Sequence, residues 1–191
     1  MKAKNMENHV CPWYVGYLLA SPLRRLFLDP EKILSPYVKE GMIVLEVGPG
    51  MGFFTLTLAK LAGETGRIIC VDVQEKMLNN LRKRADKAGL LSRVEPRLCS
   101  KDTLQIDDLK GKLDFALAFA VVHEVPDAKK LFTEIFSSLK SGGVLLVSEP
   151  AGHVTKEEFD STLLIARSVG FRILDSKNIK RSHSIILKKV P

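Results

Sequence analysis

The chain has 191 residues, of which 46% are hydrophobic and 27% charged, the balance of an ordinary globular domain with room for a sizeable core. No apolar run approaches the roughly 18 residues that a membrane-spanning helix needs. The three cysteines, Cys11, Cys70 and Cys99, are too scattered to suggest a disulfide framework or a zinc site. We therefore expect a cytoplasmic domain without a transmembrane segment and without a bound metal.

The net charge is +7, from 29 Lys and Arg against 22 Asp and Glu. Such a balance can indicate a surface for nucleic acid or for acidic substrates. The basic residues are spread along the chain, however, and no recognised RNA- or DNA-binding motif accompanies them. A solvated basic surface is the favoured interpretation, and a nucleic-acid partner stays an alternative.

Residues 1–39 differ in composition from the rest of the chain, because they hold the only tryptophan, Trp13, and all three tyrosines. Ser21-Pro22 and Asp29-Pro30 each combine an N-cap residue with a proline at the first helical position. The pattern predicts an arm of short helices. This arm could plug an edge of the following domain, or its aromatic and basic residues could contact a membrane surface.

The most informative stretch begins with an apolar run, Met42–Val47, which is short enough for a buried strand. It leads into Gly48-Pro49-Gly50-Met51-Gly52 and then into a segment with helical apolar spacing. A strand, a glycine-rich turn and a helix together bring backbone close to a nucleotide-like ligand. The spacing G-x-G-x-G is not that of a dinucleotide site, and Glu46 would repel a pyrophosphate but suit a cationic ligand.

A second buried strand, Arg67–Val71, ends in Asp72, roughly 20 residues beyond the glycine turn. A carboxylate at this place can accept both hydrogen bonds of a ribose diol. The alternative is that Asp72 only caps the next helix.

Further strands are predicted from apolar runs, and the weakest of them, Val94–Leu98, contains Pro96, which favours an edge position. Leu113–Val122 is apolar enough for a central strand. Ser141–Gly143 is predicted as a turn before a strand at Val144–Val147. A capping box, Thr155 to Glu158, then opens a helix that ends at Gly170. The last two strands are predicted at Phe171–Leu174 and Ser184–Leu187.

At this point the sequence resembles the class I S-adenosylmethionine-dependent methyltransferases. Glu46–Gly52 matches their first motif, E/D-x-G-x-G-x-G, and Asp72–Leu78 is similar to their D-x-S-x-x-M-L signature, with Gln74 in place of serine. The resemblance covers about residues 40–190. It implies an α/β fold: a single doubly wound, seven-stranded, mostly parallel sheet with an antiparallel last strand and helices on both faces. Residues 1–39 would form an N-terminal helical lid on a Rossmann-like domain at 40–191.

The resemblance also implies S-adenosyl-L-methionine as cofactor, held mainly by the glycine turn and Asp72. Ser100 stands where the family often has an aspartate for the adenine amino group, and Asp102 is a possible substitute. The expected cofactor-binding residues are Glu46, Gly48, Pro49, Gly50, Gly52, Asp72, Val73, Ser100, Lys101, Asp102 and Ala120.

Methyl transfer in this family is an in-line displacement that depends mainly on alignment, so no common catalytic residue can be carried over. A base is needed only if the acceptor must lose a proton. Loop packing is an equally open role for several of the polar residues near the strand ends. The candidates for substrate contact or base are Tyr14, Tyr17, His123, Glu124, Glu149 and His153.

The chain has no N-P-P-Y motif, which argues against methylation of adenine or glutamine amino groups. It also lacks the cysteine motifs of cytosine C5 methylation and the paired carboxylates of catechol-type enzymes. We therefore expect methyl transfer to a small organic acceptor. The alternatives are an RNA or protein methyltransferase and a non-catalytic S-adenosylmethionine-binding module.

Overall fold

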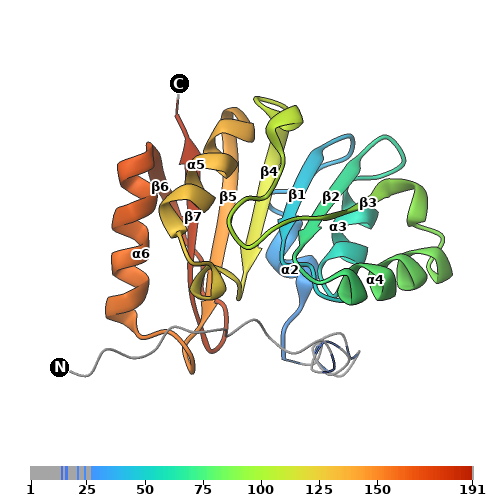
Figure 1. Ribbon diagram of the computed structural model, residues 1–191, viewed down its shortest axis with the longest axis horizontal. Coiled ribbons are helices and arrows are strands. Elements are labelled where there is room, and N and C mark those ends of the chain that lie inside the picture. The colour runs from blue at the N-terminus through green and yellow to red at the C-terminus, as the bar shows by residue number, and fades with distance from the viewer. Residues whose placement is uncertain (1–13, 15, 17–20, 22–23, 25–26, 191) are drawn as a thin grey trace.

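The computed structural model describes residues 14, 16, 21, 24 and 27–190, and in this part the chain forms a seven-stranded sheet (Figure 1). The strands lie in the spatial order β3-β2-β1-β4-β5-β7-β6. They comprise β1 Ile43–Val47, β2 Arg67–Asp72, β3 Val94–Leu98, β4 Leu113–Phe119, β5 Leu139–Pro150, β6 Phe171–Ser176 and β7 Ser182–Lys189. Strands β1 to β5 pair in parallel, whereas β7 is antiparallel to β5 and β6. The predicted fold class is confirmed.

Helices cover both faces of the sheet, because successive strand residues point to opposite sides. Val44 packs with the helices of one face and its neighbour Leu45 with α5 of the other. The first face carries α2 Pro30–Leu34, α3 Thr55–Leu61 and α4 Glu75–Lys87; the second carries α5 Ala128–Ser138 and α6 Lys156–Val169. Short 3-10 turns lie at Leu91–Arg93, Asp107–Leu109 and Val122–Glu124.

Three helix starts have side-chain caps, and those at α2 and α6 are the ones that the sequence predicts. The side chain of Asp29 accepts from the backbone N–H groups of Glu31 and Lys32, and Pro30 is the first residue of α2. Asp127 caps α5 in the same way, and Thr155 and Glu158 form both bonds of the predicted capping box at α6. Each cap satisfies donors that the first helical turn leaves without an intrahelical partner.

The edge prediction for Pro96 is confirmed, since β3 has a neighbour on one side only. The predicted turn at Ser141–Gly143 is wrong, because these residues lie inside β5, which begins at Leu139. Leu113 pairs with Leu139 and Phe115 with Val144, so the segment between them is an irregularity in the ladder, with Gly142 at φ +82°. A left-handed glycine absorbs the extra residues without ending the strand.

Much of the predicted arm, including Trp13, Tyr17 and Pro22, lies outside the described residues. Its last helix, α2, packs Ile33 and Leu34 into the core of the first face. Tyr14 is largely exposed, whereas Gly16 and Arg24 line a cavity at one edge of the sheet. Within the described ranges, no helix has the length and apolar character to cross a membrane.

Candidate active site

The cavity lies where β1, β2 and β4 end. Strand β7 runs to the top of Figure 1, so the antiparallel partner β5 and the strands parallel to it end at the bottom of that view. In the sheet order β2 and β4 flank β1, so the chain crosses from one side of β1 to the other at this edge. Such a switch point is where open α/β sheets bind ligands.

The glycine turn that follows β1 has three residues in the left-handed region: Gly48 at φ +65°, Gly50 at +54° and Gly52 at +85°. The backbone N–H of Gly48 donates to the carbonyl of Val71 (2.9 Å) and so joins the ends of β1 and β2. A side chain at Gly48 would lie 2.8 Å from Cγ2 of Val121. The missing side chain therefore lets the loop after β4 approach the turn.

Gly50 and Gly52 serve different purposes. A Cβ on Gly50 would have no atom within 4 Å, and this residue lines the cavity, so its bare backbone faces ligand space. A Cβ on Gly52 would lie 2.4 Å from Cδ1 of Leu81 on α4. Gly52, one of the predicted cofactor residues, does not line the cavity; it is needed for packing of the turn against α4.

Asp72 connects the turn to β2. Its Oδ2 accepts from the N–H of Gly50 (3.3 Å) and its Oδ1 from the N–H of Gln74 (2.8 Å). Burial raises the pKa of Asp72 to about 6, and these backbone donors oppose the shift. A carboxylate has about four acceptor positions. Asp72 thus supports the start of α4 and keeps acceptor capacity on a cavity that it lines, so the two predicted roles are compatible.

Glu46 is 3% exposed and accepts a hydrogen bond from Oγ1 of Thr55 (2.5 Å), the first residue of α3. This contact ties β1 to α3 across the glycine turn. Burial raises the pKa of Glu46 to about 7, opposed by the hydrogen bonds from Thr55 and Cys70. Cys70 is fully buried beside both.

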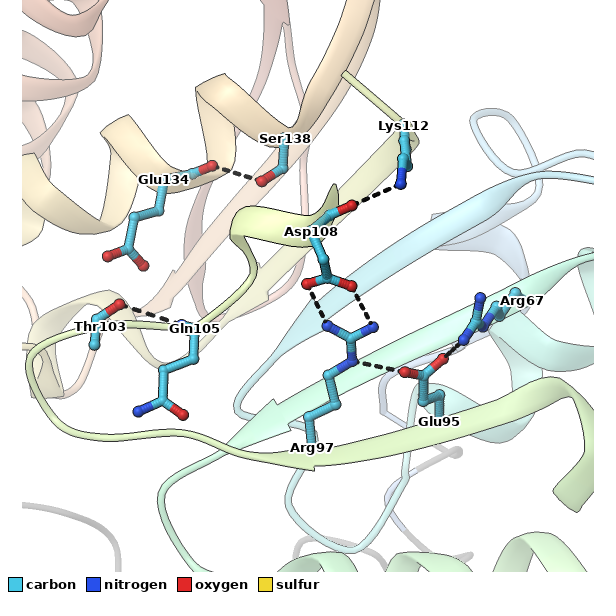
Figure 2. A network of polar contacts seen from close by, with 9 residues as sticks. All are labelled: Arg67, Glu95, Arg97, Thr103, Gln105, Asp108, Lys112, Glu134 and Ser138. Carbon is cyan, nitrogen blue, oxygen red and sulfur yellow. Dashed lines mark hydrogen bonds and ion pairs between the residues drawn. The ribbon is translucent and has the colours of Figure 1, made fainter. Parts of the chain in front are cut away.

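The loop after β3 forms another wall of the cavity. Oγ of Ser100 accepts from the N–H of Asp102 (3.3 Å), and the N–H of Ser100 donates to the carbonyl of Thr103 (3.2 Å). Glu134, on α5, reaches over this loop in Figure 2 and accepts from the N–H of Leu104 (2.6 Å). The loop is therefore held by its own turn and by α5.

Outside this loop, a chain of ion pairs fixes β3 to the segment before β4 (Figure 2). Arg97 donates two parallel hydrogen bonds to Asp108 (2.8 and 2.9 Å) and one to Glu95 (2.7 Å), which also pairs with Arg67. A planar guanidinium suits this two-pronged geometry. The hydrogen bonds from Arg97 lower the pKa of Asp108, so this carboxyl stays charged in the pair.

The loop after β4 begins at Ala120, a non-glycine residue at φ +56° whose N–H donates to the carbonyl of Ser148 (2.7 Å). Glu149, 1% exposed at the end of β5, supports the residues after Ala120. Its Oε1 accepts from the N–H groups of Val121 (3.2 Å) and Val122 (2.9 Å). Its Oε2 bonds to Nδ1 of His123. Glu149 therefore fixes both the backbone and the imidazole of this loop.

His123 is held from several sides. The hydrogen bond to Glu149 raises the pKa of His123, and burial opposes the rise. Its Nε2 lies 4.0 Å from Oε1 of Glu124, and the ring of His153 meets it edge-on at 5.9 Å between centroids. Of these residues only Glu124 lines the cavity.

Arg24 adds a cation to the cavity. Its guanidinium carbon lies 4.5 Å from the ring centroid of Phe53, 6.0 Å from that of Phe54 and 5.9 Å from that of Phe119. These are cation–π distances. Burial lowers the pKa of Arg24 from its ordinary value, although an arginine stays charged at neutral pH.

The cavity suits a cationic cofactor such as S-adenosylmethionine. Among the described lining residues, six are acidic and two, Arg24 and Lys101, are basic. The acidic ones are Glu46, Asp72, Asp102, Glu124, Asp127 and Glu134. This excess of carboxylates contrasts with the net charge of +7 for the whole chain. Together with the open backbone at Gly50 and the remaining acceptor capacity of Asp72, it fits a sulfonium-bearing nucleoside.

Comparison with known proteins decides the family. A family model described as a methyltransferase domain matches residues 38–181. The chain belongs to this family. A crystal structure of a SAM-dependent methyltransferase from Aquifex aeolicus is similar, with a TM-score of 0.85 and 27% identity, covering 95% of this chain and 100% of that one. S-adenosyl-L-methionine is the cofactor of the domain.

Two curated relatives have different acceptors in their names. The ribosomal protein L11 methyltransferase of Dictyoglomus turgidum is 28% identical over 155 residues, 81% of this chain and 47% of the relative. The ubiquinone/menaquinone biosynthesis C-methyltransferase of Hydrogenovibrio crunogenus is 30% identical over 112 residues, 59% of this chain and 43% of the relative. The present methyltransferase domain spans less than half the length of either relative.

Most of the predicted cofactor residues of this methyltransferase domain are brought together. The cavity is lined by Glu46, Gly48, Pro49, Gly50, Asp72, Val73, Ser100, Lys101, Asp102 and Ala120. Of the six candidates for substrate contact, Glu124 lines the cavity; Tyr14, His123, Glu149 and His153 do not, and Tyr17 lies outside the described residues. Glu149 has the loop-supporting role that the sequence left as its alternative.

Sequence reasoning missed Thr55, Arg24 and Glu134. Thr55 has a local signal, because a hydroxyl in the first turn after a glycine loop can reach back to the carboxylate that precedes the loop. Arg24 and Glu134 come from segments far from the motifs, and their positions depend on how the arm and α5 pack.

Proposed function

We propose that this methyltransferase domain transfers a methyl group to a small organic acceptor by in-line displacement. The observation that carries the proposal is the make-up of the cavity: beside the glycine turn and Asp72, its lining includes Phe53, Phe119 and Val125. Small-molecule sites combine an apolar lining with a few placed polar groups. Similarity to a ubiquinone/menaquinone biosynthesis methyltransferase supports the same acceptor class.

The cofactor supplies a methyl group on a sulfonium, so its leaving group is already activated. The residues of this chain then have to bind, orient and exclude water. Asp72 has acceptor capacity for the ribose hydroxyls, and the bare backbone of Gly50 leaves space beside it. Glu124 is a cavity carboxylate close to His123, and it is the candidate for taking a proton from an acceptor that must lose one.

A protein or RNA acceptor is the second candidate. The net charge of +7 and the similarity to a ribosomal protein L11 methyltransferase favour it. A basic surface binds polyanions in a strongly salt-dependent way.

Cofactor binding is tested by calorimetric titration with S-adenosylhomocysteine, with NAD as the control ligand. We expect wild-type binding of S-adenosylhomocysteine and none of NAD. Asp72→Ala should weaken the binding of S-adenosylhomocysteine by about 100-fold, which is about 2.7 kcal/mol of binding free energy. Asp160→Ala is the matched control, because Asp160 pairs with Lys156 on α6 and does not line the cavity. Tight NAD binding, or no binding of either ligand, contradicts the proposal.

The acceptor class is tested with S-adenosylmethionine carrying a labelled methyl group and a lysate of cells that express the chain. The lysate is separated into a small-molecule filtrate, an RNA fraction and a protein fraction. Label in the filtrate supports the small acceptor. Salt-sensitive labelling of RNA or protein supports the second candidate, and cofactor binding without label in any fraction indicates a non-catalytic binding module.

A further inference from the structure

Arg24 is placed unusually for a residue of this cavity. Its guanidinium lies over the ring of Phe53, with the rings of Phe54 and Phe119 about 6 Å away, and it lines the same cavity as the glycine turn. A surface arginine would keep its head in water. Arg24 instead gives up part of its hydration, which lowers its pKa. A cation held in an aromatic wall at a ligand site suggests a task in binding.

The positive charge of Arg24 suits it to bind an anionic ligand. The other charged groups of the cavity are mostly carboxylates, which favour the positive sulfonium of the cofactor. Arg24 acts against that preference, because like charges repel most where water is displaced. An arginine at this place is useful if the second ligand of the cavity brings a negative charge.

The ring contacts of Arg24 come from a different part of the cavity edge than Asp72 and Ser100. Its guanidinium lies closest to Phe53, which directly follows the glycine turn after β1, and it also lies near Phe119, the last residue of β4. Asp72 ends β2 and Ser100 follows β3. Since β1 lies between β2 and β4, the two strand ends are about 10 Å apart. Arg24 thus lies where the turn after β1 meets the end of β4, whereas Asp72 lies at the end of β2.

The geometry also fits a particular anion. Stacking uses the flat face of a guanidinium, whereas hydrogen bonding uses the N–H groups at its edge, so the two are compatible. A carboxylate matches that edge with two parallel bonds, which are strengthened by low local dielectric. The phenylalanine rings beside it can pack against an apolar body attached to the carboxylate.

We propose that the acceptor is a small organic acid and that Arg24 binds its carboxylate. This inference rests on the proposed function and names the substrate class of the same site. Arg24 is then a specificity-determining residue on the acceptor side.

The first experiment uses ligand-observed NMR on the protein saturated with S-adenosylhomocysteine. The probes are benzoate, 2-naphthoate and hexanoate, each paired with its neutral amide. We expect at least one acid to bind at least about tenfold more tightly than its amide, a difference of about 1.4 kcal/mol. Equal binding of acid and amide for every pair, or no binding of any acid, overturns the proposal.

The second experiment compares three variants with the bound acid. Arg24→Met should lose at least about tenfold in affinity and Arg24→Lys less, because lysine keeps the charge but not the fork. Arg82→Met is the matched control, since Arg82 donates to Asn79 and to the carbonyl of Pro96 outside the cavity. It should bind the acid like wild type. Unchanged acid binding by Arg24→Met contradicts the assignment, and a thermal melt shows whether each variant is folded.

The cofactor also carries a carboxylate, and a third arm separates the two sources. Binding of S-adenosylhomocysteine is compared with binding of 5′-methylthioadenosine, which lacks the amino-acid carboxylate. We expect Arg24→Met to bind both like wild type. Selective loss of S-adenosylhomocysteine assigns Arg24 to the cofactor and overturns the proposal. Failure of the wild type to bind S-adenosylhomocysteine would instead contradict the proposed function itself.

Discussion

Two carboxylates of the same cavity edge, Asp72 and Glu149, show how differently similar sequence positions can be used. Both end a buried strand of the parallel sheet, Asp72 on β2 and Glu149 near the end of β5. Asp72 lines the cavity and bonds to the turn that a ligand would approach. Glu149 is directed under the loop after β4, where two backbone N–H groups and His123 use its oxygens.

The difference separates two tasks of an active site. On the β1–β2 side, the polar groups face the ligand and are held by backbone contacts of the glycine turn. On the β4–β5 side, the buried polar groups position a loop, and residues of that loop, Ala120 and Glu124 among them, line the cavity. Substitutions on the two sides should therefore separate cofactor affinity from stability.

The largest effect is expected within the glycine turn itself, from Gly50→Ala against Gly52→Ala. A Cβ at Gly50 meets open ligand space, so the variant should lose only about 1 kcal/mol of folding stability through its left-handed backbone. Its affinity for S-adenosylhomocysteine, however, should be about 100-fold lower than that of wild type, a loss of about 2.7 kcal/mol in binding free energy. In Gly52→Ala the new Cβ clashes with Leu81, so this variant should lose about 2–4 kcal/mol of folding stability. Urea unfolding and calorimetry measure both, and equal profiles would contradict the distinction.

Glu149→Ala comes next, because it leaves two buried N–H groups and the imidazole of His123 without their acceptor. We expect a loss of about 3 kcal/mol in the free energy of unfolding by urea. Glu149→Gln keeps one acceptor oxygen for the backbone and should lose about 1 kcal/mol. Asp72→Asn, in contrast, should affect S-adenosylhomocysteine binding more than folding. A Glu149→Ala variant as stable as wild type would show that the loop does not depend on this carboxylate.

The sequence carries a clear signal for the role of the glycine turn and Asp72, and little signal for the role of Glu149. The apolar runs, the glycine spacing and Asp72 are local patterns, and they predicted the strands and the turn because neighbouring residues determine them. Glu149 has the same local signature as Asp72, a carboxylate after a buried strand. Its role depends on the loop 27 and 28 residues away in the sequence, and only the packing of β4 against β5 brings the two together.

Gly142 and Arg24 show two other limits. Ser141-Gly142-Gly143 has the composition of a turn, but β5 pairs with β4 on both sides of it, at Leu139 and at Val144, so the segment is an irregularity within β5. Arg24 belongs to no motif, and the arm brings it over Phe53. In both places, long-range contacts decide what the local residues do.

A smaller effect concerns pH and the buried carboxyl of Glu46. Its folded pKa of about 7 lies above the ordinary value of 4.5, so the folded state binds a proton that the unfolded state has lost between these values. The free energy of unfolding should therefore fall as pH rises from 4.5 to 7, and above pH 7 it should fall no further on account of Glu46. Asp72 and His123 shift stability in the same direction, since both pKa values are raised.

The variant Glu46→Gln isolates the contribution of Glu46 to this pH dependence of stability. Relative to wild type, the variant should become more stable by about 1–3 kcal/mol between pH 5 and pH 8, measured by urea unfolding at each pH. Asp108→Asn is the control, because the pKa of Asp108 is lowered and its titration lies below this window. Parallel stability curves for Glu46→Gln and wild type would mean that Glu46 is not protonated more readily in the folded state.

The smallest effect is expected at Thr55, whose hydroxyl donates to Glu46. Thr55→Val keeps the shape but removes the donor, and it should cost about 1 kcal/mol at pH 8, where the carboxylate is charged. At pH 5 the carboxyl is protonated and the cost should shrink, because a neutral acid depends less on one donor. The same change should raise the pKa of Glu46, since the Thr55 hydrogen bond opposes the effect of burial. Thr55→Ser, which keeps the hydroxyl, should show neither the pH-dependent loss nor the pKa change. A loss of stability by Thr55→Val that is the same at both pH values would assign the effect to packing of α3 rather than to the charge of Glu46.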